Sequence, residues 1–266
     1  MLAEGTLAGK TALVTGGGTG IGLAIAREFK RLGANVAIAS RKPEVLEAAV
    51  QELEAIGGGG KAAFFPLDVR QPEAIEQVAS EIAGRLGPVD ILVNNAAGNF
   101  VVPATELSPR GWQAVIDIVL NGTWFCTHAF GKRMIERGTG GSILNIVATY
   151  AWTGGPGTIH SASAKAGVLA MTETLAVEWA MHGIRVNALA PGPIENTGGA
   201  AKLWAVPEIG EGVRKSVPLG RFGRPEEVAW LAGYLASDYA AYVNGACLVI
   251  DGGAWLNKGM FAILPT

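Results

Sequence analysis

Residues 11–22 read Thr11-Ala12-Leu13-Val14-Thr15-Gly16-Gly17-Gly18-Thr19-Gly20-Ile21-Gly22, and a stretch of helical period follows as far as Leu32. The first five residues have the length and the β-branched side chains of a buried strand. The glycines after them allow backbone conformations that other residues avoid, and they let another group approach the backbone closely. These residues therefore predict a strand, a tight turn and a helix, which form the first unit of an α/β fold.

The same alternation continues along the chain. Longer stretches of helical period separate further apolar runs, which are residues 35–39, 62–67, 90–94, 142–148, 184–189 and 247–250. Strands that are apolar on both faces, with amphipathic helices between them, indicate a parallel sheet covered on both sides. No linker of disordered composition divides the chain. We therefore expect a single domain over residues 1–266, built on a doubly wound parallel sheet of about seven strands with helices on both faces.

Composition excludes several classes of protein. The chain has 21 Lys and Arg against 23 Asp and Glu, so we expect no nucleic-acid partner, because phosphate backbones require a concentrated positive surface. Charges, Gly or Pro interrupt every apolar run before the roughly 18 residues that a membrane helix needs, so we expect no membrane partner. The two Cys and three His have no ligand spacing, which predicts no metal. The same cysteine usage favours a reducing compartment, and we expect a cytoplasmic protein.

The glycine-rich turn predicts a phosphate site. Free N–H groups and the helix dipole at the start of a helix stabilise a pyrophosphate that approaches through such a turn. The spacing here is G-x-x-x-G-x-G rather than the G-x-G-x-x-G of the usual dinucleotide fingerprint. The residues expected to bind a dinucleotide cofactor at this turn are Gly16, Gly18, Thr19, Gly20, Ile21 and Gly22.

The end of the second expected strand indicates which dinucleotide is bound. Sites that prefer NAD carry a carboxylate there for the ribose 2′-hydroxyl, whereas this chain has Ser40-Arg41-Lys42. A hydroxyl and two cations suit a 2′-phosphate, and cations at the positive start of a helix are better placed with an anionic partner. We expect Ser40 and Arg41 to bind NADP(H). The alternative is that Arg41 and Lys42 are solvated charges.

Residues 192–218 break the alternation. The stretch is rich in Gly and Pro, and it leaves the carboxyl end of an expected strand. Long loops in this position are usually lids or binding loops. We therefore expect a substrate lid here, with a simple surface loop as the alternative.

Five segments in this order resemble the short-chain dehydrogenase/reductase family: Thr15 to Gly22, Asp68-Val69, Asn94 to Gly98, Ser163-Ala164-Lys165 and Pro191 to Ile194. The resemblance covers nearly the whole chain. It implies a Rossmann-type single domain, a nicotinamide cofactor and a homotetramer. It also implies further cofactor contacts, at Asp68, Val69, Asn95, Ala96, Gly98, Lys165, Pro191, Gly192, Pro193 and Ile194.

The chain departs from the catalytic set that is usual in that family, which is Asn, Ser, Tyr and Lys. Alignment on Lys165 puts Ser161 where the Tyr belongs. Alignment of the neighbouring segments puts Ala148 at the Ser and Val119 at the Asn. Because three of the four groups are absent, the chain has either lost activity or carries out different chemistry.

These departures resemble one subgroup, the 2,4-dienoyl-CoA reductases of unsaturated fatty acid β-oxidation. The segments that carry the likeness are Asn95 to Phe100, Asp117 to Thr123, Ser161 to Gly167, and a Tyr fifteen residues before Lys165, at Tyr150. The resemblance implies NADPH-dependent reduction of a 2,4-dienoyl-CoA to an enoyl-CoA, expected to be a 3-enoyl-CoA. The catalytic residues that it implies are Tyr150, Asn99, Lys165 and Ser161. The residues that it implies for the acyl-CoA thioester are Arg70, Phe100, Ser108, Ser161 and Lys202, with Lys202 standing where subgroup members can carry Arg.

Other interpretations of these residues stay open. Tyr150 is also typical of a core rim, Asn99 of a turn, and Ser161 of a helix N-cap. His160 is adjacent to the site, but the subgroup does not need it as an acid. Two other functions remain: a carbonyl reductase acting on 3-oxoacyl thioesters, and a catalytically silent NADP(H)-binding sensor. Acyl chain length, double-bond geometry and the final proton donor are not determined by the sequence.

Overall fold

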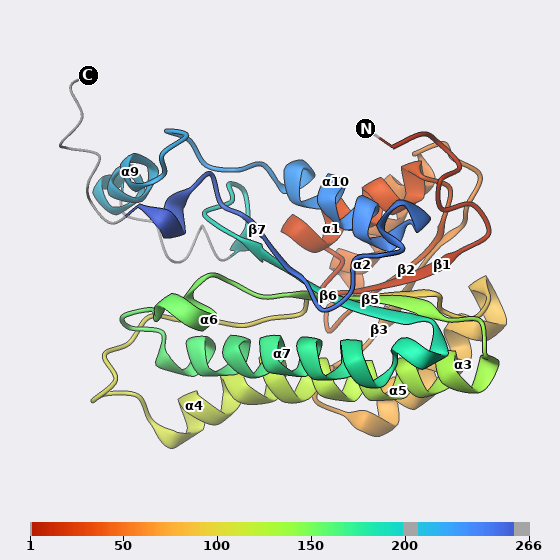
Figure 1. Ribbon diagram of the computed structural model, residues 1–266, viewed down its shortest axis with the longest axis horizontal. Helices are drawn as coiled ribbons and strands as arrows, with labels where there is room; N and C mark the ends of the chain where they lie inside the picture. Colours follow the sequence, from red (N-terminus) through yellow and green to blue (C-terminus); the bar gives the residue numbers. More distant parts are fainter. Residues whose placement is uncertain (1, 199–206, 258–266) are drawn as a thin grey trace.

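The computed structural model describes residues 2–198 and 207–257. Its centre is one seven-stranded sheet in the order β3-β2-β1-β4-β5-β6-β7, in which every neighbouring pair is parallel (Figure 1). The expected doubly wound sheet of about seven strands is confirmed. The strands are β1 Thr11–Thr15, β2 Asn35–Ser40, β3 Ala62–Pro66, β4 Ile91–Asn94, β5 Gly141–Ile146, β6 Ile184–Pro191 and β7 Cys247–Ile250.

Helices cover both faces of this sheet, with α1, α2 and α10 on one side and α3, α5 and α7 on the other (Figure 1). Shorter helical turns occur at 180–182, 238–240 and 254–256. Among the described residues, no helix is long and apolar enough to cross a membrane. The helices are α1 Gly20–Arg31, α2 Pro43–Glu54, α3 Pro72–Leu86, α4 Pro109–Ile116, α5 Gly122–Arg137, α6 Tyr150–Thr153, α7 Ile159–Glu178, α9 Pro207–Ser216 and α10 Pro225–Ala236.

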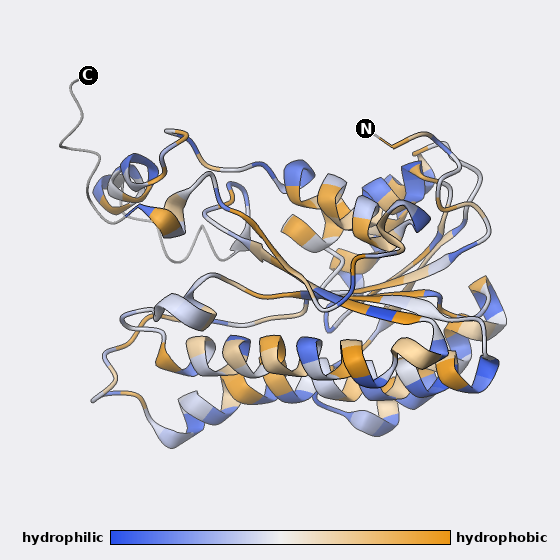
Figure 2. Cartoon of the chain, in the orientation of Figure 1, coloured by the Kyte–Doolittle hydropathy of each residue, from blue (hydrophilic) through white to orange (hydrophobic). Residues whose placement is uncertain are grey.

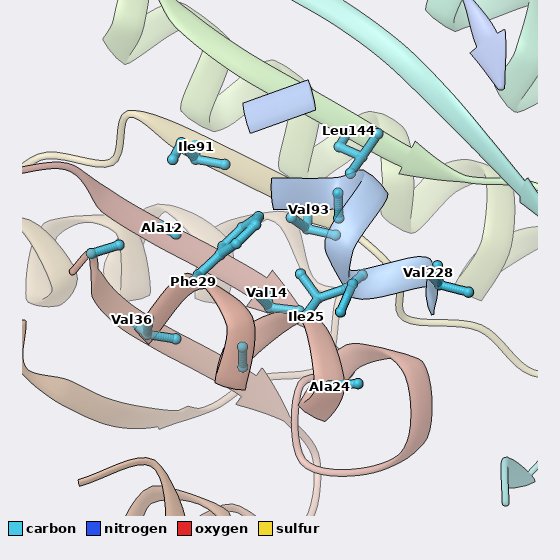
Figure 3. Packing of buried hydrophobic residues seen from close by; sticks show 14 of the residues in the cluster. Ala12, Val14, Ala24, Ile25, Phe29, Val36, Ile91, Val93, Leu144 and Val228 are labelled. Atoms are coloured by element: carbon cyan, nitrogen blue, oxygen red, sulfur yellow. The ribbon is translucent and has the colours of Figure 1, made fainter. Parts of the chain in front are cut away.

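The apolar sides of the helices face the sheet, and their polar sides face outward (Figure 2). On the α1 side, Ile25 and Phe29 are completely buried and point toward Val14 and Val93 of the central strands, with Val228 of α10 beside them (Figure 3). Removal of this apolar surface from water is the main favourable term in folding. Strand β1 is buried between the helices on the two faces of the sheet. This packing fixes the point at which the glycine-rich turn leaves the sheet.

A buried polar network joins the sheet to the helices on the other face. The Asn94 amide of β4 donates to Thr127 Oγ1 and to Asn145 Oδ1, both at 2.8 Å. The Asn145 amide of β5 donates in turn to Thr172 Oγ1 of α7, also at 2.8 Å. Buried hydrogen bonds are directional, and this network therefore fixes α7 relative to the carboxyl ends of β4 and β5.

Some local structure differs from expectation. The helix expected from about Ser161 begins two residues earlier at Ile159, and the added short helix α6 precedes it. A π-helical turn, Asp117–Asn121, separates α4 from α5, and such turns are frequent at functional sites. Within the expected lid, the structure places α9, while 199–206 lie outside the described residues.

Candidate active site

The glycine-rich turn takes a shape that glycine alone accommodates. Gly16 and Gly20 have φ angles of +65° and +54°, in the left-handed region. A Cβ on Gly22 would lie 2.4 Å from the Gly16 carbonyl oxygen, and one on Gly17 would lie 2.7 Å from a methyl group of Ile38. The turn is therefore packed against the sheet behind it, and its backbone is the surface that remains for a ligand.

Residues after β4 hold this turn from the neighbouring strand. The Thr15 hydroxyl donates to the Val93 carbonyl at 3.2 Å and accepts the N–H groups of Asn95 at 3.0 Å and Ala96 at 3.1 Å. The Asn95 amide donates back to the carbonyls of Thr15 and Gly16, at 3.0 and 3.2 Å. Asn95 and Ala96, which are expected to contact the cofactor, thus also hold the glycine-rich turn in its conformation.

The start of α1 suits an anion. Its N-cap, Thr19, makes no side-chain capping hydrogen bond, and the first turn contains no acidic residue. The first-turn N–H groups therefore keep their capacity to bind a pyrophosphate. Thr197, from the segment after β6, lies 3.6 Å from the position that a Cβ on Gly20 would take. The glycine-rich turn therefore meets the segment after β6, which begins with Gly192 to Ile194, as expected for a cofactor site.

The ends of β2 and β3 carry a group of charges. Ser40 ends β2, and Arg41 and Lys42 are exposed at the start of α2. Beyond β3, the Arg70 guanidinium binds the Asp68 carboxylate through both oxygens, at 2.9 and 2.5 Å. This hydrogen bond holds the pKa of Asp68 below its usual range, and the charge of Arg41 adds to the effect. Arg70, expected to contact the substrate, therefore pairs with Asp68, which is expected to contact the cofactor.

Three of the four expected catalytic residues come together around α6 and α7. The Tyr150 hydroxyl lies 3.0 Å from Ser161 Oγ. Lys165 is one turn further along α7, and its Nζ donates to the Ile146 carbonyl at the end of β5. Ser161 and Lys165 are 2% and 6% exposed. The side chains of Ser161 and Lys165 are therefore shielded from water near the carboxyl end of β5.

Burial sets the protonation of two of these groups. It raises the pKa of the Tyr150 phenol, an effect that the hydrogen bond with Ser161 partly opposes. It also lowers the pKa of the Lys165 ammonium to about 8. A phenol is already protonated at neutral pH, and the raised pKa keeps the Tyr150 hydroxyl available as a donor at higher pH as well.

Asn99 comes from the loop after β4. Its Oδ1 accepts the N–H of Phe100 at 2.9 Å, which leaves the amide NH₂ as its donor group. The same loop rests on the start of α7: the Val102 N–H donates to the Gly157 carbonyl at 2.9 Å, and the Phe100 ring meets the His160 ring with centroids 4.4 Å apart. Asn99 thus belongs to a loop that packs beside Ser161.

The structure gives the helical positions of two serine residues that were expected in the site. Thr158 is the N-cap of α7 and Ser161 lies within the helix, so the alternative that Ser161 caps it is wrong. Ser108, expected on the substrate path, is itself the N-cap of α4, and its Oγ accepts the Gly111 N–H at 3.1 Å. Lys202, the remaining substrate residue, lies outside the described residues.

The comparisons with known proteins define the class. A family profile described as enoyl-(acyl carrier protein) reductase matches residues 16–254. The chain belongs to the short-chain dehydrogenase/reductase family and is an oxidoreductase, with the nicotinamide cofactor that this family uses.

The names of similar proteins are more specific than the family name. The chain is 50% identical over 253 residues to a Bacillus subtilis protein named as a probable (2E)-enoyl-CoA-producing 2,4-dienoyl-CoA reductase, with 95% of this chain and 99% of that protein covered. It is 44% identical over 256 residues to a Caenorhabditis elegans protein named as a probable (3E)-enoyl-CoA-producing 2,4-dienoyl-CoA reductase, with 95% and 82% covered. Among solved structures, a short chain dehydrogenase from Bacillus anthracis matches with a TM-score of 0.88 and 51% identity, covering 96% of this chain and 99% of that one.

Proposed function

We propose that this protein is an NADPH-dependent 2,4-dienoyl-CoA reductase. The observation that carries the proposal is the position of the Tyr150 hydroxyl, which lies 3.0 Å from Ser161 Oγ and whose pKa is raised by burial. The chain lacks the usual family Ser and Asn, because Ala148 and Val119 stand there. A proton donor at Tyr150 nevertheless supplies what reduction of a conjugated thioester needs. The two relatives named above support the same substrate class.

The chemistry follows from where negative charge develops. The cofactor, when bound, supplies a hydride to the distal end of the diene. Electron density then moves to the thioester oxygen, so the protein must offer donors that are already aimed at that oxygen. We assign this role to the Tyr150 hydroxyl and the Asn99 amide, with Ser161 holding Tyr150. Lys165 binds the nicotinamide ribose, which gives its ammonium an acceptor besides the Ile146 carbonyl. The final proton goes to carbon from Tyr150 or from water.

For the cofactor, we propose NADP(H) over NAD(H). Arg41 and Lys42 are exposed beside Ser40, where a carboxylate would select the unphosphorylated ribose. A 2′-phosphate would give these cations an anionic partner at the positive start of α2. The further residues that we assign to the cofactor are Gly16, Gly18, Thr19, Gly20, Ile21, Gly22, Asp68, Val69, Asn95, Ala96, Gly98 and Pro191 to Ile194.

For the substrate, we assign Phe100, Ser161, Arg70 and Lys202 to the thioester and its CoA. Phe100 is 39% exposed although it packs against His160, so part of its ring is available for contact. Ser108 contributes by fixing the start of α4, since its Oγ is already engaged there.

We also propose a cytoplasmic homotetramer that acts in the β-oxidation of unsaturated fatty acids. Self-association is supported by β7, which ends the sheet and has half-exposed residues throughout. Sheet edges of this kind are usually covered by another element or another subunit. Sedimentation equilibrium tests the assembly state, and a monomer at micromolar concentration would refute it.

One assay tests the reaction. NADPH oxidation is measured with a 2,4-dienoyl-CoA, a 2-enoyl-CoA and a 3-oxoacyl-CoA, each also with NADH. Turnover of the dienoyl-CoA alone, and faster with NADPH, is the expected result. Turnover of the 3-oxoacyl-CoA alone would identify a carbonyl reductase, and NADPH binding without turnover would identify a sensor. Chromatographic identification of the product distinguishes a 3-enoyl-CoA, which we expect, from the 2-enoyl-CoA product in the name of the Bacillus subtilis relative.

A further inference from the structure

His160 lies in the site, yet the reaction proposed above assigns it no role. It is the second residue of α7 and is fully buried. Its Nδ1 accepts the N–H of Ser161 at 2.8 Å. Its ring meets the Phe100 ring edge to face, with centroids 4.4 Å apart and planes at 80°. Within the part of the chain that the structure describes, its Nε2 has no hydrogen-bond partner.

The bond to Ser161 determines the form of the imidazole. A nitrogen that accepts an N–H carries no proton, so the neutral ring carries its proton on Nε2. A buried N–H without an acceptor costs about 1–3 kcal/mol, and such groups are rare in folded proteins.

The other nitrogen satisfies the backbone of α7. The first-turn N–H groups of a helix have no partner within the helix. The N-cap Thr158 makes no side-chain capping bond, so His160 Nδ1 provides the acceptor for Ser161 that a capping side chain would otherwise provide. This hydrogen bond holds the backbone of Ser161, and the side-chain hydroxyl of the same residue contacts Tyr150.

We propose that His160 is a positioning residue with two separable effects. Through Nδ1 it fixes Ser161, and through Ser161 Oγ it fixes the Tyr150 hydroxyl. Through its ring it fixes Phe100, which we assign above to the thioester substrate. The assignment of effects on turnover rests on the proposed function. The hydrogen bonds that link His160 to Ser161 and Ser161 to Tyr150 do not depend on the proposed function.

Two variants separate the effects. His160→Asn places an amide oxygen near the position of Nδ1 but removes the ring. His160→Phe keeps a ring against Phe100 but removes the acceptor. We expect His160→Asn to keep kcat for a 2,4-dienoyl-CoA within about threefold of the wild type and to raise KM at least about fivefold. We expect His160→Phe to lower kcat at least about tenfold with KM nearly unchanged, because small displacements of a donor have large effects on rate. The dissociation constant of NADPH serves as the control for an intact cofactor site.

A second measurement does not depend on turnover. In protein labelled with ¹³C at tyrosine Cζ, the Tyr150 signal reports the hydrogen bond at its hydroxyl, and Tyr150→Phe assigns the signal. His160→Asn should keep the wild-type shift, and His160→Phe should move it. If the wild type does not turn over a dienoyl-CoA, the proposed function fails and this signal alone decides the role of His160. The positioning role is refuted if both variants keep the wild-type signal, or if both change kcat and KM by the same factors.

Discussion

Replacing Lys165 with Met should stabilise the protein at neutral pH, by an amount that shrinks as pH rises. Burial lowers the pKa of the Lys165 ammonium from 10.5 to about 8. Each unit of pKa difference between the folded and unfolded states corresponds to about 1.4 kcal/mol, so at pH 7 the buried charge costs about 3 kcal/mol of folding free energy. Met fills a similar volume without a charge. It also leaves the Ile146 carbonyl without the Nζ donor, which offsets part of the gain at every pH.

The sign of the pH dependence follows from proton binding. Between pH 8 and pH 10.5 the unfolded wild-type chain binds more protons at Lys165 than the folded chain does, so wild-type stability rises with pH in that range. The cost of the buried charge therefore falls from about 3 kcal/mol at pH 7 to about 2 kcal/mol at pH 9 and about 1 kcal/mol at pH 10. The Met variant lacks this rise.

Urea denaturation of the cofactor-free protein at pH 7, 8, 9 and 10 measures the effect. The difference in unfolding free energy between Lys165→Met and the wild type should decrease by about 2 kcal/mol from pH 7 to pH 10. Lys165→Arg is the matched control, because its charge does not titrate in this range and its difference from the Met variant should stay constant. A difference between Met and wild type that does not change with pH would refute the argument that Lys165 is charged and desolvated in the folded protein.

Three further changes test the site. Tyr150→Phe should lower kcat on a 2,4-dienoyl-CoA at least about 100-fold without changing the dissociation constant of NADPH, since only the donor is lost; a loss below about threefold would place proton donation elsewhere. Gly22→Ala should weaken NADPH binding at least about tenfold in a fluorescence titration, because its Cβ would lie 2.4 Å from the Gly16 carbonyl oxygen; unchanged affinity would mean that the turn can move. Arg70→Ala should weaken NADPH binding several-fold at low salt by leaving the Asp68 charge uncompensated, and the effect should shrink at 0.5 M salt. An effect of the same size at high salt would contradict this electrostatic origin.

The fold and the phosphate turn were predictable because their signals are local. The alternation of apolar runs determines a parallel sheet, and the glycines from Gly16 to Gly22 stand in a continuous stretch directly after β1. The pairing of Asp68 with Arg70 is also local, since the residues are two apart, and their spacing could have indicated it.

Other features depend on contacts that no local pattern carries. Asn95 reaches Thr15 across 80 residues of sequence, and only the pairing of β1 with β4 brings them together. Only the resemblance to a subgroup indicates Tyr150, because its contact with Ser161 requires the short helix α6, which no local sequence pattern predicts. The resemblance gives His160 no role, because the subgroup does not need it as an acid, and its position directly before Ser161 is the only local signal for it.

The bracing of the glycine-rich turn has a consequence for how the protein is made. The turn is complete in sequence by Gly22, yet the groups that hold it, Asn95 and Ala96, are synthesised more than 70 residues later. A nascent chain that ends before β4 therefore exposes a glycine-rich turn that lacks its hydrogen bonds with Asn95 and Ala96. It also exposes strand β1 without its neighbour β4. Contacts so distant in sequence form slowly, and unpaired strands invite aggregation. Capture of the dinucleotide on the ribosome accordingly becomes possible only after about the first third of the chain has emerged, so cofactor availability bears on the late steps of folding and not on the early ones.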